Sequence, residues 1–313
     1  MHYVAHRLFA AHDRALAATL AHQLALKLGE DQVFLPFCDT DEEDLVADTK
    51  GRRLFELDRD RLRRIRALVA IVHGPSPDDG VCMEVGYAAA LGAPVILLTT
   101  DFQDYSTTLH SPHTVFPDPL LDALATHIVR VPRLGTPTKQ PAATRFADFA
   151  ARNHAQTEHA VQACVDAVLR LPARPDAPPR SSRDDARTVF AEPSPYASPH
   201  APFPGLTAAT GHAVRVPARF AAADPITAAR HDWTSALRST RIVVDASGPE
   251  TPPGAALLIG AACATGQPVA MYLPHAAYTH AAGREPNHRN LMIQYSVNAA
   301  LHTPGEVTAW IGG

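Results

Sequence analysis

The sequence has few cysteines, and they are not arranged to build a metal centre or a disulfide framework. Its 313 residues contain four, widely separated and with no C-x-x-C pair: Cys38, Cys82, Cys164 and Cys263. We therefore expect no disulfide scaffold and no zinc ribbon, and we expect the protein to work in a reducing cytoplasm. Seventeen histidines are present, but none stands in an H-E-x-x-H or similarly spaced motif. We expect neither a metal site nor another cofactor.

Long apolar runs and net positive charge are also missing. No apolar stretch approaches the roughly 20 residues of a membrane span, and the first residues, MHYVAHRLFAAHDR, place His and Arg where a signal peptide needs apolar residues. The formal net charge is -4 and the pI is about 6.5, whereas proteins that bind a phosphate backbone usually carry net positive charge. We expect neither a membrane nor a nucleic acid as a partner. With 46% hydrophobic and 19% charged residues, the composition is that of a globular protein.

The first half of the chain predicts strands that alternate with helices. Apolar runs and turn signals indicate strands at residues 3–8, 32–37, 67–72 and 94–98, and apolar spacing indicates helices at residues 13–28, 54–66, 83–91 and 146–171. Residues 39–48 and 73–80 are expected to be loops. Alternation of this kind is typical of a parallel sheet whose strands are joined by crossover helices.

The chain changes character after residue 171 and then starts the same alternation again. Residues 172–186, PARPDAPPRSSRDDA, combine proline with charge and predict a stiff, exposed linker. Strands are expected at residues 187–191, 214–216 and 241–244, with a helix near residues 232–238 and a small-residue helix after a Gly/Pro loop. We therefore predict a first domain at residues 1–171, the linker at 172–186 and a second domain at 187–313.

An internal repeat accounts for the restart. When the chain is shifted by 174 residues, nine of the 22 positions from Gly74 to Val95 are identical to those from Gly248 to Val269, without a gap. Most of the matches are glycine and proline, which are retained where a backbone geometry must be kept. We infer a duplication. The polar residues of the first copy are lost in the second: Asp78, Asp79, Glu84 and Tyr87 become Pro252, Pro253, Leu258 and Ala261. This pattern predicts one working site and one structural copy.

Three carboxylates of the first copy are candidates for chemistry. Glu84 lies in the first turns of the helix after the loop, at the carboxyl end of a strand, where open α/β sheets bind ligands. Asp78 lies six residues earlier, and Asp58 is expected to begin the helix before that strand. Carboxylates that meet at one cleft suit glycosidic chemistry, in which one attacks the sugar carbon and another handles the proton of the leaving group. The alternative is that Asp78 only caps the helix and Glu84 only interacts with its dipole.

The stretch from Gly74 to Asp101, GPSPDDGVCMEVGYAAALGAPVILLTTD, resembles the nucleoside 2-deoxyribosyltransferase family. The pattern is a G-x-x-x-D-x-G loop, then E-x-G-Y-A, then L-G-x-P and a strand that ends in T-D. Residues 3–9 resemble the family's first strand and loop, and Asp58 stands at the usual distance before the second loop. The resemblance covers about residues 1–105 with good motifs and residues 187–313 more weakly. It implies two flavodoxin-like (Rossmann-like) parallel-sheet α/β domains that form an intrachain pseudo-dimer with one composite active site.

The resemblance also implies roles for individual residues. Glu84 would be the nucleophile that attacks the anomeric carbon and forms a glycosyl-enzyme ester. Tyr3 would hydrogen-bond the Glu84 carboxylate and position it. Asp78 and Asp58 would hold the base edge, with Asp78 as the proton source for the departing base.

A further contact is expected from the second copy. Family members form oligomers in which a neighbouring subunit sends an Asn-x-Met segment into the site to hold the sugar 5′-hydroxyl. Asn290-Leu291-Met292 matches that segment, and nothing similar follows residue 101 in the first copy. The alternative is that Asn290 is the N-cap of a helix over residues 292–300. We expect Asn290 and Met292, with Phe9 and Gly80 of the first copy, to contact the substrate.

These expectations lead to an enzyme of nucleoside metabolism and nucleotide salvage. It would cleave a nucleoside N-glycosidic bond through Glu84 and pass the (deoxy)ribosyl group to another base or to water, with nucleosides and nucleobases as its small-molecule partners. A nucleoside 5′-monophosphate N-glycosidase and a non-catalytic nucleoside-binding module stay open as alternatives. Three further questions stay open: whether the enzyme is a transferase or a hydrolase, whether the sugar is ribose or deoxyribose, and whether the chain forms further homo-oligomers. Residues 103–145 do not match the family pattern and are a candidate specificity insert, and His6 and Arg7 are not assigned to the site.

Overall fold

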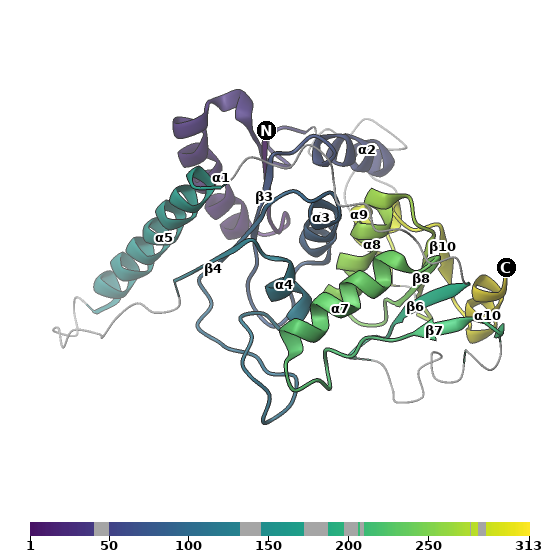
Figure 1. Ribbon diagram of the computed structural model, residues 1–313. Helices are drawn as coiled ribbons and strands as arrows, with labels where there is room; N and C mark the ends of the chain where they lie inside the picture. Colours follow the sequence, from purple (N-terminus) through teal and green to yellow (C-terminus); the bar gives the residue numbers. More distant parts are fainter. Residues whose placement is uncertain are drawn as a thin grey trace.

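The computed structural model describes residues 1–40, 50–131, 145–171, 187–196, 206, 210–275, 277–280 and 286–313. In this part of the chain, the strands form two five-stranded sheets in which every neighbouring pair is parallel (Figure 1). The first sheet has the order β2-β1-β3-β4-β5, and the second has the order β10-β9-β8-β6-β7. Matched in chain order, the two arrangements are the same. The prediction of two flavodoxin-like parallel-sheet domains is confirmed.

The elements have the following bounds. The first sheet contains β1 (His2–Ala5), β2 (Val33–Phe34), β3 (Ala67–Ile71), β4 (Val95–Thr99) and β5 (His127–Arg130), and the second contains β6 (Thr188–Glu192), β7 (Ala213–Arg215), β8 (Arg241–Asp245), β9 (Val269–Tyr272) and β10 (Ala299–Leu301). The helices are α1 (Ala11–Leu28), α2 (Lys50–Leu62), α3 (Asp79–Ala90), α4 (Pro119–Leu124), α5 (Arg145–Leu169), α7 (Pro225–Arg238), α8 (Pro253–Thr265), α9 (Leu291–Gln294) and α10 (Pro304–Gly312), with a 3-10 turn, η1, at Glu30–Gln32. None of the described helices combines the length and the apolar character needed to cross a membrane.

Helices cover both faces of the first sheet. All residues of β3 and β4 are buried, as expected for strands that are covered on both sides. One face packs against α1 and α5 (Figure 1). Leu20, Leu24 and Val165 of these helices belong to one buried cluster with Val69 of β3. The other face packs against α2 and α3. Loops follow the carboxyl ends of the strands, and the candidate site lies among these loops.

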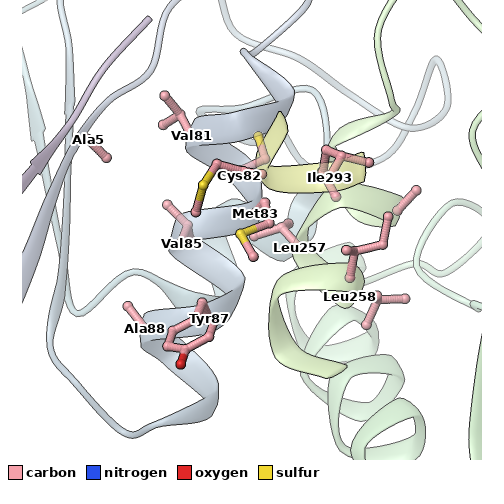
Figure 2. Close-up of a cluster of buried hydrophobic side chains, with 14 of the residues drawn as sticks. Ala5, Val81, Cys82, Met83, Val85, Tyr87, Ala88, Leu257, Leu258 and Ile293 are labelled. Carbon is pink, nitrogen blue, oxygen red and sulfur yellow. The ribbon is translucent and has the colours of Figure 1, made fainter. Parts of the chain in front are cut away.

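The two domains meet where α3 and α8 cross, as Figure 2 shows with Met83 and Leu257 between the helices. A Cβ atom on Gly86 would lie 1.9 Å from the backbone oxygen of Leu257, and one on Gly260 would lie 1.9 Å from that of Met83. Only glycine fits such a crossing. The shift of 174 residues carries Met83 to Leu257 and Gly86 to Gly260, so the contact is reciprocal, as in a two-fold dimer interface. These glycines of the repeat are therefore positions of helix contact.

Several boundaries differ from those expected. The helix expected at residues 54–66 is α2, which begins at Lys50, so Asp58 lies in its second half and not at its start. The strand expected at residues 32–37 is only two residues long, because η1 precedes it. Helix α9 has four residues, and β10 takes the place of the end of a helix over residues 292–300. The linker at 172–186 and residues 41–48 of the acidic loop lie outside the described residues, so the domain boundaries stay predictions.

Candidate active site

A cavity of about 430 Å³ lies beside the loops that follow β1 and β3, where the strand order of the first sheet changes direction. Open α/β sheets bind ligands at such a point, and the volume is in the range of small-molecule sites. Seven of the eight predicted site residues line it: Phe9, Asp58, Asp78, Gly80, Glu84, Asn290 and Met292. The eighth, Tyr3, is connected to the cavity through Glu84. Both domains therefore contribute to one cavity.

Glu84 lies in the second turn of α3 and is 6% exposed. The hydroxyl of Tyr3, on β1, donates a hydrogen bond to Oε1 of Glu84. Burial raises the pKa of Glu84 well above its usual value, the hydrogen bond from Tyr3 lowers it, and the neighbouring Asp58 and Asp78 carboxyl groups raise it. Glu84 is thus a desolvated carboxyl group held in one orientation, which is what a carboxylate nucleophile needs.

Asp78 is the N-cap of α3, and its Oδ1 accepts the backbone N–H of Val81 at 3.0 Å. The capping alternative is therefore correct for this residue, but the same carboxyl group also lines the cavity. Burial and the neighbouring Asp79 raise the pKa of Asp78 to about 7, although Val81 and Arg7 act in the opposite direction. The Nε of Arg7 lies 3.7 Å from Oδ2. A carboxyl group that titrates near neutral pH is suited to deliver a proton to a leaving group.

Further acidic groups come from both domains. Asp58 lies on the buried face of α2 and is 4% exposed. Two carboxyl groups that the sequence analysis did not assign also line the cavity, Asp79 and Glu250. Oδ2 of Asp79 accepts the backbone N–H of Thr251 at 3.2 Å, which joins the two domains at the edge of the site. With Asp78 and Glu84, five carboxyl groups line the cavity.

Asn290 enters from the second domain and contacts the first. A Cβ atom on Gly80 would lie 2.5 Å from Nδ2 of Asn290, so the missing side chain at Gly80 makes room for the amide. Oδ1 of Asn290 accepts the backbone N–H of Met292 at 2.9 Å and caps α9. Oδ1 is thus used in the cap, and Nδ2 is the part of the amide that lies against Gly80. The neighbouring Arg289 fixes the segment, because its Nη2 donates to the carbonyl oxygen of Ala246 at 2.7 Å.

Sequence reasoning missed several residues of the cavity wall. His6, which was not assigned, lines the cavity, and so do Thr279, His280 and His288 from the segment before Asn290. In the sequence, His6 is marked only by its place within residues 3–9, and the other three only by preceding the Asn-Leu-Met segment. Both signals are too general to select these residues.

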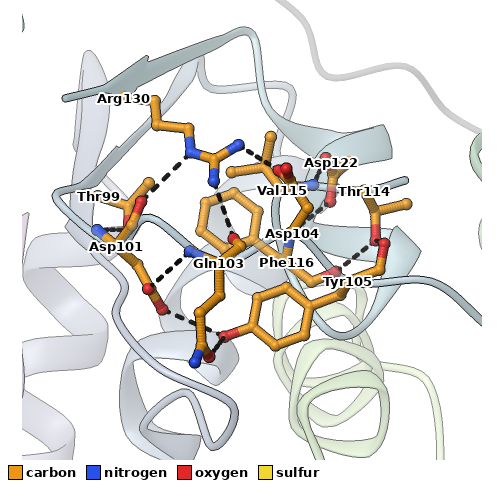
Figure 3. A network of polar contacts seen from close by, with 10 residues as sticks. All are labelled: Thr99, Asp101, Gln103, Asp104, Tyr105, Thr114, Val115, Phe116, Asp122 and Arg130. Atoms are coloured by element: carbon orange, nitrogen blue, oxygen red, sulfur yellow. Dashed lines mark hydrogen bonds and ion pairs between the residues drawn. The ribbon is translucent and has the colours of Figure 1, made fainter. Parts of the chain in front are cut away.

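The candidate specificity insert is described from residue 103 to residue 131, and none of those residues lines the cavity. A polar network fixes this segment instead (Figure 3). Arg130 donates to the carbonyl oxygen of Asp101 and pairs with Asp104. The carboxylate of Asp122 accepts two backbone N–H groups just before α4. In the described part, the segment positions α4, which packs against α7 of the second domain.

Comparison with known proteins finds a family model that matches the first part of the chain. Residues 2–135 match the family model described as nucleoside 2-deoxyribosyltransferase, so the resemblance inferred from the motifs is confirmed over that range. Among solved structures, the chain is similar to a conserved protein from Enterococcus faecalis V583. The sequence identity is 27%, the match covers 39% of this chain and 72% of that chain, and the TM-score is 0.29. A comparison with curated proteins finds no match.

Proposed function

Because residues 2–135 match the family model of nucleoside 2-deoxyribosyltransferase, we propose that this protein cleaves the N-glycosidic bond of a nucleoside and passes the (deoxy)ribosyl group to a second base or to water. One observation carries the proposal. The buried Glu84, held by Tyr3, shares a cavity with Asp78 and with Asn290 of the second domain. A nucleophile, an acid and a sugar contact are thus available to one ligand.

Glu84 is the proposed nucleophile. Its carboxylate attacks C1′ of the sugar as the bond from C1′ to the base nitrogen breaks, and a glycosyl ester forms on Glu84. Asp78 gives its proton to the departing base, which leaves neutral, and Asp78 becomes a carboxylate. In the second step, an incoming base or water attacks C1′, gives its proton to Asp78 and releases Glu84. Two displacements at C1′ return the sugar with its original configuration.

The ionisation of Asp78 supports its role as the acid. With a pKa of about 7, Asp78 carries a proton in a large fraction of molecules at neutral pH. Mutual repulsion favours a state in which only one of the two neighbouring carboxyl groups is charged. Burial keeps the pKa of Glu84 well above its usual value, and the hydrogen bond from Tyr3 acts in the opposite direction, because it stabilises the ionised form that a nucleophile needs.

The cavity wall favours a substrate without a phosphate. A 5′-monophosphate would bring two negative charges toward a wall in which five carboxyl groups outnumber one arginine, Arg289, and three histidines. A 5′-hydroxyl, in contrast, is able to accept a hydrogen bond from Nδ2 of Asn290. This charge pattern ranks the nucleoside above its 5′-monophosphate as substrate. The retained pair of Tyr3 and Glu84 favours turnover over binding alone.

The test is an assay of free base released from a panel of 2′-deoxynucleosides, ribonucleosides and their 5′-monophosphates, with and without a second base as acceptor. We expect release from nucleosides and, after rapid quenching, a mass increase equal to one sugar on the peptide that contains Glu84. Release from the monophosphates alone would identify the nucleotide glycosidase. Calorimetric binding of nucleosides without release of base would identify a binding module.

A further inference from the structure

The second domain has a cleft position that corresponds to the cavity of the first. The shift of 174 residues matches Asp232 with Asp58 and Gly254 with Gly80. Both aspartates are buried on the helix that precedes the third strand of their sheet. Both glycines lie in the first turn of the helix at the domain junction.

Two further positions complete the correspondence. Strand β6 pairs with β8 in the register by which β1 pairs with β3, and this register puts Phe190 where Tyr3 stands. Asp118 is the N-cap of α4 in the first domain, as Asn290 is the N-cap of α9 in the second. Each cap residue reaches the other domain. A Cβ atom on Gly254 would lie 2.5 Å from Oδ2 of Asp118, just as Asn290 lies against the matching glycine of the first domain.

Arg219 fills this second position. Its side chain is 0% exposed, and its Nε and Nη2 donate to the two carboxylate oxygens of Asp118 at 2.8 and 2.9 Å. The guanidinium also donates to both oxygens of Glu192, from Nη1 at 3.2 Å and from Nη2. Oδ2 of Asp232 lies 3.5 Å from Nη1 and accepts the backbone N–H of Arg219 at 3.1 Å. Arg219 therefore binds Asp118 through two parallel hydrogen bonds, the geometry by which a guanidinium ion binds a carboxylate.

We propose that Arg219 is the built-in occupant of the second cleft, which it closes to substrate, and that its bond to Asp118 locks the two unlike domains together. A Cβ atom on Gly254 would lie 2.2 Å from Nη2 of Arg219. The absence of a side chain at Gly80 makes room for the amide of Asn290, and the absence of one at Gly254 makes room for the guanidinium of Arg219. Three buried carboxylates, Asp118, Glu192 and Asp232, depend on this cation, because uncompensated buried charge strongly opposes folding.

The lock also selects which domains pair. If two first domains faced each other, Asp118 of one would approach the five carboxyl groups of the other, and like charges would repel. If two second domains faced each other, the neutral Asn290 would replace Asp118 beside Arg219. Only the pairing of a first domain with a second domain places the Asp118 carboxylate against the Arg219 guanidinium and the Asn290 amide against the cavity of the first domain.

Thermal unfolding of the full chain tests the proposal and needs no substrate, so its outcome is independent of the proposed function. We expect Arg219→Ala to lower Tm by about 10 °C, because three buried carboxylates lose their cation. Arg219→Lys keeps the charge without the fork and is expected to lose less. Millimolar guanidinium, far below denaturing concentrations, should restore part of the loss in Arg219→Ala, saturably, whereas sodium chloride at the same concentration should not. If Arg219→Ala does not fold by itself, the refolding yield with guanidinium and with sodium chloride gives the same comparison.

A double-mutant cycle gives a second measurement. Gly254→Ala should lower Tm more in the otherwise unchanged chain than in Arg219→Ala, because the added methyl group collides most closely with the guanidinium, at 2.2 Å. It also approaches Oδ2 of Asp118 at 2.5 Å and Oε1 of Glu192 at 2.8 Å, but without the guanidinium these two carboxylates are no longer held in place and can move aside. Gly312→Ala, which meets nothing within 4 Å, is the matched control and should behave alike in both backgrounds. Rescue by guanidinium together with a non-additive cycle supports the proposal. Equal responses to guanidinium and sodium chloride, or an additive cycle, overturn it.

Discussion

The clefts of the two domains share a backbone arrangement and differ in how their charges are balanced. The first keeps five carboxyl groups around an open cavity, and the pKa values of Asp78 and Glu84 are raised there. In the second, Phe190 and Leu258 replace the polar pair, and Arg219 forms hydrogen bonds or an ion pair with Asp118, Glu192 and Asp232. The acids of the second domain thus have a cation of the chain beside them, whereas the acids of the first domain face the cavity.

The largest effect is expected from Glu84→Gln, which removes from the first cleft the carboxylate that the second lacks at Leu258. The amide keeps the size of the side chain and an acceptor for Tyr3 but loses the nucleophilic charge. We expect kcat for base release to fall by at least about 1,000-fold, as for other lost covalent nucleophiles. The exposed Glu158→Gln is the control and should keep full activity. Near wild-type turnover of Glu84→Gln would place the nucleophile elsewhere.

Tyr3→Phe gives the first cleft the side chain that the second has at Phe190. A hydrogen bond to a charged group contributes about 1.5–3 kcal/mol, so kcat should fall by roughly 10- to 150-fold. Because this hydrogen bond lowers the pKa of Glu84, its loss should move the acidic limb of the kcat profile to higher pH. The exposed Tyr196→Phe should leave the profile unchanged. An unshifted acidic limb would contradict the role of Tyr3.

Asn290 allows its two roles to be separated. Asn290→Ala removes both the cap of α9 and the Nδ2 donor, whereas Asn290→Ser keeps a capping oxygen and removes only the donor. For a buried hydrogen bond of about 1–3 kcal/mol, KM should rise by about 5- to 150-fold in both variants. Tm should fall in the alanine variant alone. If KM is unchanged in both, Asn290 is only a cap and the composite site is wrong.

The smallest effect concerns stability and pH. In the folded chain Asp78 has a pKa of about 7, above its unfolded value of about 3.9. The folded state therefore holds a proton that the unfolded state releases, and stability falls as pH rises from about 4 to 7. Asp78→Asn keeps a capping side chain and removes this fall, so its Tm should change less between pH 5 and pH 8 than that of the wild type, by a few degrees. The exposed Asp60→Asn should behave as the wild type does.

The fold around the candidate site could be predicted from local sequence signals. The apolar run of β3, the glycines of the loop and the small residues of α3 each predict their own element, and the structure has all three. The roles of the individual site residues were harder to predict. Spacing alone left capping and catalysis as alternatives for Asp78, and the residue both caps a helix and lines the cavity. The family resemblance was needed to assign Tyr3 and Asn290, whose roles stay predictions.

Arg219 lay beyond the reach of sequence reasoning. In the segment VPARFAAAD it has no local feature that distinguishes it from an exposed arginine. Its burial depends on Asp118 and Glu192, which precede it by 101 and 27 residues, and no short pattern joins such distant groups. The retained Gly254 was visible in the repeat, but a matched glycine indicates only that space is needed and not what fills it.

The cross-domain position of Asn290 also sets an order in time. Asn290 follows Glu84 by 206 residues, which at roughly 5–20 residues per second of synthesis is about 10–40 s. Throughout that interval the emerging chain carries its proposed nucleophile but not Asn290, and α3 has no α8 to cover its glycine face until residues 253–265 have been added. A chain interrupted before residue 290 lacks Asn290 in the proposed active site. Activity would therefore require that synthesis has passed through both halves of the chain.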